Sequence, residues 1–283
     1  MSSAVIVAHH QRVEAAALAV TAATWLRQRG FAVWMPPADA FALSLDALAD
    51  ARPPGEADLA LSLGGDGTML RTIDLLDGSK TTVLGVNVGQ LGYLTEVEPG
   101  ALVGALERYT AGDYEVEERM MLAVEAEPVG QARPRGWRAL NEAVIERQES
   151  GHTVRLHVRI DGAPFTTYAA DGLIVATPTG STAYSLSARG PVVSPRHRAL
   201  LLTPVSPHML FDRALVLDPD ETIEIEVAGT RSADLNVDGQ RALTLAQGST
   251  VRFQAASESA RFVRFGPQRF HQILKAKFGL ADR

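Results

Sequence analysis

Leu61-Ser62-Leu63-Gly64-Gly65-Asp66-Gly67-Thr68-Met69-Leu70-Arg71 is the stretch that decides the fold of this 283-residue chain. The apolar run 59–63 predicts a short buried strand, and a helix-like segment follows the three glycines around Asp66. Glycine lets backbone approach a ligand closely, and the first turn of a helix offers unpaired N–H groups and a partial positive charge. The order of strand, glycine turn and helix start favours phosphate binding, and the aspartate adds a base or a metal ligand.

Two familiar phosphate-binding motifs are excluded. The Walker A motif requires Gly-Lys followed by Ser or Thr, and the chain has no Gly-Lys pair. The dinucleotide fingerprint needs glycines as G-x-G-x-x-G; Gly65 and Gly67 fill the first two places, but Leu70 fills the third. A plain glycine-rich turn between strand and helix stays open as an alternative at this point.

Composition is that of a soluble globular protein, with 46% hydrophobic and 21% charged residues. No apolar run approaches the roughly 18 residues of a membrane helix. The segment 1–7 has no basic region before its apolar residues, so it predicts a first strand rather than a signal peptide. The absence of cysteine excludes disulfides, thiolate nucleophiles and cysteine-ligated metals, and we expect a cytoplasmic protein.

The net charge of −6 argues against a nucleic-acid partner, which requires a basic surface. An anionic small substrate remains compatible with it, because local arginines, helix ends and a divalent cation neutralise phosphates inside acidic proteins. The histidines show no H-E-x-x-H zinc signature, and we expect no metal cage made of protein ligands.

The first hundred residues alternate strand and helix signals. Strands are predicted at 5–8, 31–35, 59–63 and 82–88, and a helix at 13–29 that stops at Gly30. This alternation predicts a parallel α/β layer. In such a layer ligands collect at the carboxyl ends of the strands, where the glycine turn lies.

The pattern changes near Gly112 to a period of two. Residues 154–160 and 223–227 alternate between apolar and polar, and Asp161-Gly162 and Asp238-Gly239 are hairpin signals. We expect an antiparallel, sandwich-like second domain. Residues 268–278 predict a helix that docks back on the first domain. The expected domains are 1–112 with about 260–283, and 113–259.

Three further segments indicate a binding site. Residues 85–95 carry three glycines and Asn87, and Asn141-Glu142 places two polar residues inside an apolar run, so one of them faces the interior. Residues 171–187 run from Asp171 through a strand into Thr-Pro-Thr-Gly-Ser-Thr, where Ser181 or Thr182 is placed to cap a short helix. Ordinary turns and a solvated strand edge are the alternatives for the first two. Arg71, one turn into the helix after the glycines, is a candidate phosphate partner.

These residues together resemble the NAD kinase family. The resemblance covers nearly the whole chain in the family's order: GGDGT at 64–68, the Asn-x-Gly segment at 87–94, the Asn-Glu pair, the DGLIVATPTGSTAYSLSA segment at 171–188, and Asp-Gly-Gln at 238–240. GGDGT alone is shared with lipid kinases and phosphofructokinase-like enzymes, whereas the Thr-Pro-Thr-Gly-Ser-Thr-Ala-Tyr block is much more specific.

The resemblance implies an N-terminal Rossmann-like α/β domain and a C-terminal all-β, sandwich-like domain, with the C-terminal helix returning to the first. It implies phosphoryl transfer from ATP, or another donor, to the 2′-hydroxyl of the adenosine ribose of NAD, which gives NADP. Asp66 takes the family's role of proton acceptor. The implied cofactor is a divalent cation, generally Mg²⁺, and the implied assembly is a homodimer or homotetramer without nucleic-acid or membrane partners.

The binding residues that the resemblance implies, together with Arg71, are Gly67, Asn87, Asn141, Glu142, His152, Asp171, Thr182, Ala183, Tyr184, Ser185, Leu186, Ser187 and Gln240. Two positions depart from the family pattern. His152 stands where relatives often carry a basic residue, and Ala169 where some carry lysine. A GGDGT-type lipid kinase and a non-catalytic nucleotide sensor are the competing hypotheses; the first leaves the Thr-Pro-Thr-Gly-Ser block unexplained, and the intact glycine loop disfavours the second.

Overall fold

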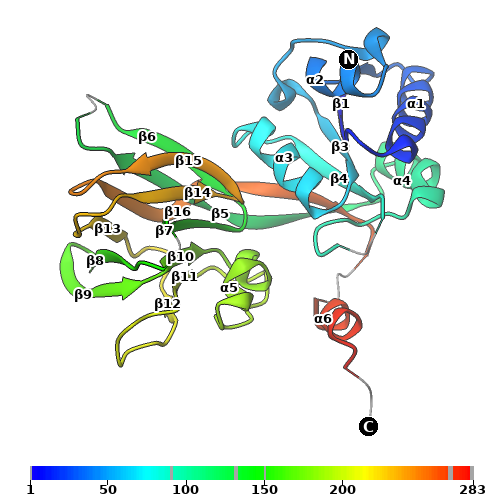
Figure 1. Cartoon of the computed structure of the whole chain (residues 1–283). Helices are drawn as coiled ribbons and strands as arrows, with labels where there is room; N and C mark the ends of the chain where they lie inside the picture. Colours follow the sequence, from blue (N-terminus) through cyan, green and yellow to red (C-terminus); the bar gives the residue numbers. More distant parts are fainter. Residues whose placement is uncertain (1, 90–91, 131–132, 150, 267–269, 281–283) are drawn as a thin grey trace. The chain divides into compact units, whose positions relative to one another are not determined.

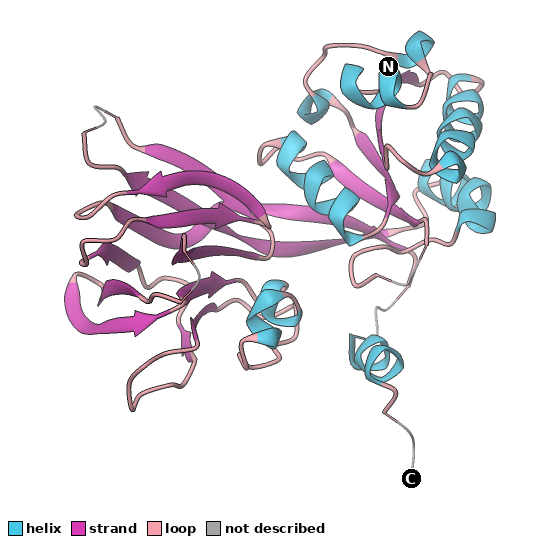
Figure 2. Cartoon of the chain, viewed as in Figure 1, coloured by secondary structure: helices cyan, strands magenta, loops and turns pink. Residues whose placement is uncertain are grey.

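The computed structural model of the chain describes residues 2–89, 92–130, 133–149, 151–266 and 270–280 (Figure 1). It divides into two compact units: unit 1 comprises Met1–Glu118 and Ala260–Arg283, and unit 2 comprises Arg119–Ser259. Unit 1 mixes helices with a parallel sheet, and unit 2 consists mainly of strands (Figure 2). The predicted fold class is therefore confirmed. The division falls inside two long strands, β5 (Glu115–Glu127) and β16 (Thr250–Arg264).

Unit 1 is built on parallel strands in the order β2-β1-β3-β4. Arg261 and Phe262 of β16 pair in parallel with β4, so the C-terminal part of the chain returns to this sheet. The elements are β1 (Ser3–Ala8), α1 (Val13–Arg27), β2 (Ala32–Trp34), α2 (Pro37–Ala42), β3 (Leu59–Gly64), α3 (Asp66–Leu76), β4 (Thr82–Asn87) and α4 (Leu102–Thr110), with short 3-10 turns at Asp46–Leu48, Pro54–Glu56 and Pro99–Ala101.

Both faces of this sheet are covered by helices, which explains why its strands are continuous apolar runs. Ile6 and Leu61 belong to a core cluster with the buried sides of α1 and α4, and Figure 1 shows α3 on the other face of the sheet. Helix α1 ends at Arg27, two residues before the predicted end, and Gly30 adopts φ +81 in the turn toward β2.

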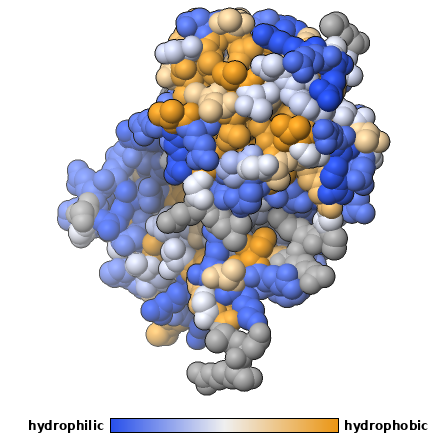
Figure 3. Space-filling view, turned by 90° about the vertical axis from the view of Figure 1, so that its right-hand side faces the viewer, coloured by the Kyte–Doolittle hydropathy of each residue, from blue (hydrophilic) through white to orange (hydrophobic). Residues whose placement is uncertain are grey.

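On the face that Figure 3 shows, apolar side chains of unit 1 adjoin one another in groups that hydrophilic side chains border. Val13, Val20 and Val103 are exposed apolar residues of this unit. No helix among the described residues is long and apolar enough to cross a membrane.

Unit 2 contains two antiparallel sheets. One has the order β12-β11-β10-β7-β14-β15, and the other runs β16-β13-β8-β9, with β5 paired to β16 and to β6. The strands are β6 (Arg135–Ala139), β7 (Glu142–Arg147), β8 (Val154–Ile160), β9 (Ala163–Ala170), β10 (Gly172–Ala176), β11 (Leu200–Val205), β12 (Leu215–Leu217), β13 (Ile223–Val227), β14 (Ala233–Val237) and β15 (Gln240–Leu245).

Alternate residues of the two sheets form one core cluster, in which Leu156 and Ile225 of one sheet join Ile145 and Leu235 of the other. This is the sandwich-like arrangement predicted from the period-two pattern. Both predicted hairpin turns are confirmed: Asp161-Gly162 has φ values of 48 and 74, and Asp238-Gly239 has 45 and 77. Positive φ at both central residues is the signature of a tight I′-type turn.

Strand β10 is buried on both faces. Leu173 and Val175 face the sandwich core, whereas Ile174 and Ala176 join a second cluster with Val144 of β7, packed by the partly buried Ala188 and Val193. The short helices η4 (Gly180–Thr182) and α5 (Tyr184–Ser187) lie next to these residues in the chain. The hydroxyl-rich block therefore covers the outer face of β7 and β10.

The final helix is α6 (Phe270–Phe278), and none of its residues is buried. The prediction placed it at 268–278; Gln268 and Arg269 lie outside the described residues. Its apolar stripe is partly exposed, with Phe278 at 53%. The segment after Ala260 is grouped with unit 1.

Candidate active site

Asp66 is the first residue of α3 and is separated from the end of β3 at Gly64 by Gly65 alone. Its two carboxylate oxygens accept hydrogen bonds from the backbone N–H groups of Tyr93, at 2.9 Å, and Leu94, at 3.1 Å. A Cβ on Gly92 would collide with this carboxylate, so a larger residue next to Tyr93 would displace it. The glycine loop and the segment after Asn87, which the sequence singled out separately, thus meet at Asp66.

The three glycines around Asp66 have different roles. A Cβ on Gly64 would collide with the hydroxyl of Thr68, so this glycine permits close packing of strand and helix. Gly65 and Gly67 have open space where a Cβ would stand. They keep side chains away from the start of α3, where unpaired N–H groups are available to an anion.

The open space belongs to a hollow of about 510 Å³, which we call the glycine-loop hollow. It lies at the carboxyl end of β1, and Gly89, at φ +122, lets the Arg12 guanidinium lie against its backbone. Cationic side chains and a helix start together suit a phosphate group. Its lining residues are Ala8, His9, His10, Gln11, Arg12, Gly65, Gly67, Thr68 and Arg71.

Arg71 lines this hollow, and its guanidinium is held by residues on α2 and β1. Its guanidinium binds both oxygens of the fully buried Asp39, at 2.6 and 2.8 Å, and donates to the Ala8 carbonyl at 2.8 Å. Burial alone would raise the pKa of Asp39, but hydrogen bonds from Arg71, His10 and the Ala8 N–H hold it below the usual value. The ionised Asp39 therefore orients Arg71 and His10. Asp39 was not predicted as a site residue, since the segment around it carries no recognisable motif.

Asn87 ends β4 beside Gly64 of β3. Its amide nitrogen lies 3.4 Å from both the Gly89 carbonyl and a Glu98 carboxylate oxygen. Its side-chain oxygen is buried and has no hydrogen-bond partner among the described residues. A buried acceptor without a partner carries a free-energy cost that a ligand hydroxyl or amine would remove.

In unit 2 the Asn141-Glu142 pair is organised by Asp238. The Asp238 carboxylate accepts the N–H groups of Leu140, Asn141 and Glu142 at 2.7, 2.8 and 3.1 Å. Asp238 itself sits at φ 45 in the hairpin turn before Gln240. The Asp-Gly-Gln motif thus fixes the start of β7, and Gln240 is the exposed first residue of β15.

Glu142 is the member of the pair that faces the interior. It is 7% exposed, and one carboxyl oxygen is buried without a partner among the described residues. Burial, followed by the charge of Asp238, raises the pKa of Glu142 to about 8, although the Tyr184 N–H bonded to it acts in the opposite direction. Glu142 is therefore mostly protonated at neutral pH and offers both a donor and an acceptor to a ligand.

The hydroxyl-rich block packs tightly on the Asn141 backbone. Thr177 donates its hydroxyl to the Leu140 carbonyl at 2.6 Å and its N–H to the Asn141 carbonyl at 2.9 Å. A Cβ on Gly180 would collide with the same Asn141 carbonyl. Two separate motifs of the sequence thus form one structure in unit 2.

The prediction that Ser181 or Thr182 caps a helix is wrong. Neither η4 nor α5 has a side-chain cap. The Ser181 hydroxyl instead exchanges two hydrogen bonds with the Val193 backbone at 3.0 Å each, and Thr182 donates to the Thr179 carbonyl at 3.3 Å. Ser185 is buried against the Thr203 hydroxyl at 3.1 Å. These hydroxyls hold the block together, because a short helix with few backbone bonds needs side-chain partners.

The rest of the block is accessible at the surface. Tyr184 and Ser187 are exposed, and Ala183 and Leu186 are partly buried. Burial and then the charges of Glu146 and Asp171 raise the pKa of Tyr184. Tyr184 therefore lies within electrostatic range of Asp171, and the structure brings these two predicted residues into one region.

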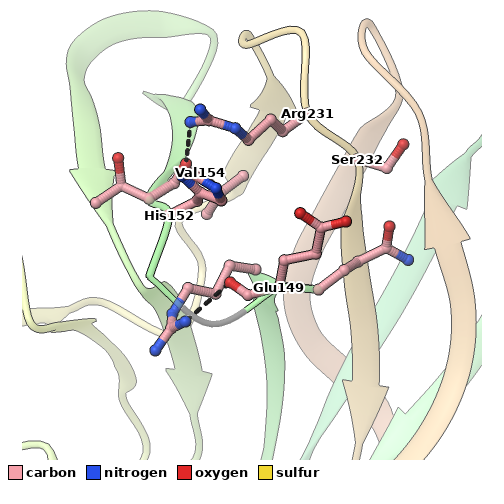
Figure 4. A pocket seen from close by; sticks show the side chains of 8 residues that line it. Glu149, His152, Val154, Arg231 and Ser232 are labelled. Atoms are coloured by element: carbon pink, nitrogen blue, oxygen red, sulfur yellow. Dashed lines mark hydrogen bonds between the residues drawn. The ribbon is translucent and has the colours of Figure 1, made fainter.

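Asp171 is ion-paired with Arg147, whose Nε lies 2.8 Å from one carboxylate oxygen. Arg147 also donates to the Glu149 carbonyl at 2.9 Å and lines a second hollow, of about 260 Å³, with His152 and Arg231 (Figure 4). His152 belongs to that hollow and not to the region of Glu142 and Tyr184. The structure links the two regions of unit 2 through Arg147, a residue that the sequence analysis did not single out.

The two units of the chain match the two domains of one family. Residues 4–114 match the model of the ATP-NAD kinase N-terminal domain, and residues 140–265 match that of the ATP-NAD kinase C-terminal domain. The chain belongs to the NAD kinase family. An NAD kinase of Heliobacterium modesticaldum is 41% identical over 96% of each chain, and one of Geotalea daltonii is 38% identical over 92% of each.

Solved NAD kinase structures share the fold. Yeast NADH kinase complexed with NADH superimposes with a TM-score of 0.90 at 26% identity, covering 100% of this chain and 89% of the yeast chain. An Archaeoglobus fulgidus NAD kinase in complex with ATP gives a TM-score of 0.75 at 23% identity and full coverage of both chains, which supports the fold alone. The family is one of phosphotransferases, so the lipid-kinase and sensor hypotheses are not favoured.

Glu142 gives this NAD kinase a predictable pH dependence. Its carboxyl has a pKa raised from 4.5 to about 8, so its stability contribution is complete below pH 4.5 and is lost as the pH rises through about 8. Glu142→Gln mimics the protonated form. We expect the variant to gain unfolding free energy relative to wild type as the pH rises from 5 to 9, on the order of 1.4 kcal/mol per unit of pKa difference. Urea unfolding at pH 5, 7 and 9 measures this difference, and a constant difference would contradict it.

Proposed function

We propose that the chain transfers a phosphoryl group from ATP to the 2′-hydroxyl of the adenosine ribose of NAD and so forms NADP. The observation that carries this proposal is the placement of Asp66, whose carboxylate is held at the first residue of α3 by two backbone N–H groups. A carboxylate fixed in this way cannot rotate freely, and general-base action depends on such positioning.

In the proposed reaction Asp66 accepts the proton of the ribose hydroxyl. The ribose oxygen forms a bond to the γ-phosphorus of ATP, the bond from that phosphorus to the β,γ-bridging oxygen breaks, and ADP leaves. Transfer of this kind depends mainly on positioning and charge neutralisation. Arg12, Arg71 and the N–H groups at the start of α3 line the glycine-loop hollow and are proposed to hold the donor phosphates.

A divalent cation, generally Mg²⁺, belongs to this chemistry. The described residues include no group of three or more His, Asp or Glu side chains arranged to hold a metal ion. We propose that the cation is held by donor phosphates and one or two carboxylates, as is usual for Mg²⁺. Each Asp66 oxygen accepts one N–H bond and retains a lone pair for such a ligand. When bound, the cation would offset the charge on the transferred group.

Unit 2 is proposed to bind the dinucleotide. Buried polar atoms without partners, such as the free Glu142 oxygen, lose their cost when a ligand hydroxyl or amide pairs with them. The residues proposed for this role are Asn141, Glu142, His152, Asp171, Thr182, Ala183, Tyr184, Ser185, Leu186, Ser187 and Gln240. Within unit 1, Gly67 and Asn87 are proposed to bind nucleotide. The homodimer or homotetramer implied by the resemblance and the cytoplasmic location expected from the absence of cysteine also stay predictions.

The direct test is incubation of the purified chain with NAD, ATP and Mg²⁺, followed by chromatography of NADP. Phosphorus NMR of the product distinguishes 2′- from 3′-phosphorylation. Separate reactions replace NAD with NADH, because yeast NADH kinase is a structural relative, and ATP with polyphosphate. Formation of 2′-phosphorylated product supports the proposal. Tight NAD binding with no product, or phosphorylation of a lipid instead, would contradict it.

Asp39→Asn tests the donor hollow separately from the dinucleotide site. Asparagine loses one of the two oxygens that hold Arg71 and His10. We expect the KM for ATP to rise on the order of tenfold, the equivalent of about 1.4 kcal/mol, while the KM for NAD changes less than twofold. Asp113→Asn, which breaks the exposed pair with Arg108, is the matched control. Equal changes in both KM values would contradict this assignment.

A further inference from the structure

Arg264, the last residue of β16, is an arginine with almost no contact with solvent. It is 3% exposed and lies about 200 residues after Asp66 in the chain. Its guanidinium donates to three acceptors of unit 1: the Glu117 carboxylate at 2.6 Å, the Glu96 carboxylate at 3.1 Å and the Leu94 carbonyl at 3.3 Å. A buried cation with this many partners is rigidly held.

The two carboxylates fix the guanidinium in place. Glu96 and Glu117 have side chains that are 16% and 11% exposed. Glu96 also accepts the N–H of Phe265 at 3.0 Å, so it binds both the side chain of Arg264 and the backbone of the next residue. The end of β16 is thereby attached to the segment that follows β4. The planar guanidinium suits this set of acceptors, with Nε on Glu117 and one Nη on both Glu96 and Leu94.

Leu94 connects Arg264 with Asp66. The N–H of Leu94 donates to Asp66 at 3.1 Å, and the carbonyl of the same residue accepts from Arg264 at 3.3 Å. One residue is thus held on its amide side by the proposed proton acceptor and on its carbonyl side by the buried arginine. The segment is held again at Glu96 and Val97, whose N–H groups donate to the Gly85 carbonyl at 3.0 and 3.1 Å.

We propose that Arg264 is a positioning residue for the phosphoryl transfer: by holding the Leu94 carbonyl, it fixes the two N–H groups that aim the Asp66 carboxylate. This inference rests on the proposed role of Asp66. Arg264 touches neither substrate in this scheme and acts through the backbone of residues 93 and 94. A displacement of about 1 Å of a reacting group costs up to 10²-fold in rate, so a loosened segment lowers turnover more than binding.

Arg264→Lys is the variant that tests this inference. Lysine keeps the positive charge between the two carboxylates but cannot reach all three acceptors in one plane. We expect kcat to fall on the order of tenfold or more, with the KM values for NAD and ATP within about twofold of wild type. Rates are divided by the folded fraction measured by circular dichroism, so that a purely structural loss does not count. Arg261→Lys, three residues earlier on the same strand, is the matched control.

Hydrogen exchange gives a second readout that is independent of activity. The amides of Tyr93 and Leu94 should exchange faster in Arg264→Lys than in wild type, while amides of β1 and β3 remain protected. Glu117→Gln weakens the support of the guanidinium without touching Leu94. It should move kcat and exchange in the same direction by a smaller amount, and it serves as the test if Arg264→Lys does not fold.

The outcomes separate this inference from the proposed function. Normal kcat in Arg264→Lys or, where that variant does not fold, in Glu117→Gln would overturn the positioning role even if Asp66→Asn is severely impaired. Normal turnover in Asp66→Asn would overturn the role of Asp66 and this inference with it. Equal losses of kcat in the Arg264 and Arg261 variants would show that Arg264 only stabilises the strand, and this result would overturn the inference.

Discussion

Asp66→Asn is expected to lower kcat by about 10²–10⁴-fold, the usual size of general-base assistance. The amide has no basic oxygen of comparable strength, so the ribose hydroxyl would lose its proton acceptor. The KM for NAD should change little, because the carboxylate is proposed to act on the proton. Initial rates at saturating ATP and NAD measure the effect.

The substitution costs little folding free energy, so a loss of turnover can be assigned to the missing carboxylate. Asparagine keeps one oxygen for either the Tyr93 or the Leu94 N–H and turns its NH₂ group toward the other. The loss is therefore one hydrogen bond, about 1–3 kcal/mol. Asp74→Asn, on the same helix, is the control and should keep wild-type turnover. A variant at position 66 that retained near-normal kcat would remove this carboxylate from the mechanism.

Asp238→Ala is expected to have the largest effect on stability. It leaves the N–H groups of Leu140, Asn141 and Glu142 without their acceptor. Each unsatisfied buried donor costs about 1–3 kcal/mol, and we expect a total loss of about 3 kcal/mol or more. The start of β7 should loosen, and the affinity for NAD should fall with it. Urea unfolding and calorimetric titration of NAD measure the two consequences.

The other Asp-Gly hairpin turn, at Asp161-Gly162, provides a closely matched control. Asp161 also has positive φ in an Asp-Gly turn, but its carboxylate accepts the Thr222 N–H at 2.8 Å in an exposed position. Alanine carries the same conformational strain at both sites. The difference between Asp238→Ala and Asp161→Ala therefore isolates the hydrogen bonds to residues 140–142. Equal losses of unfolding free energy would show that turn strain, and not the anchoring of β7, explains the effect.

Much of the fold was predictable because local patterns agree with it. The apolar runs of β1, β3 and β4 appear as strands because helices cover both faces of their sheet. The alternation in β8 and β13 shows one buried face. The Asp-Gly turns were predictable because they need positive φ at both central residues. The bounds of α1 were less exact, because residues 28–30 continue the helix as a turn, in which the N–H groups of Arg29 and Gly30 bond to the carbonyls of Leu26 and Arg27.

The long strand β16 was not predicted. Its fifteen residues include Ser257-Glu258-Ser259 in the middle, which breaks the apolar alternation. The strand contributes Val251 and Phe253 to the core of unit 2 and Val263 to that of unit 1. A strand that serves two cores does not show one continuous pattern, so a sequence reading based on a single face misses it.

The candidate site was predictable as a set of segments but not as a set of contacts. The motifs around Asp66, Asn141 and Asp171 were found from residue types alone. The partners Asp39, Arg147 and Arg264 were missed, because each is a lone charged residue whose importance depends on what folding places beside it. The role of the hydroxyl block was only partly predicted, since the Ser181 hydroxyl bonds to the Val193 backbone instead of capping a helix.

Gly92 links two parts of the sequence that lie 26 positions apart. Any larger residue there would occupy the space of the Asp66 carboxylate. A larger residue at position 92 would therefore have to displace the carboxylate from its two N–H donors. An engineer who wishes to redesign the glycine loop around Asp66 has to treat residues 66 and 92 as a single unit.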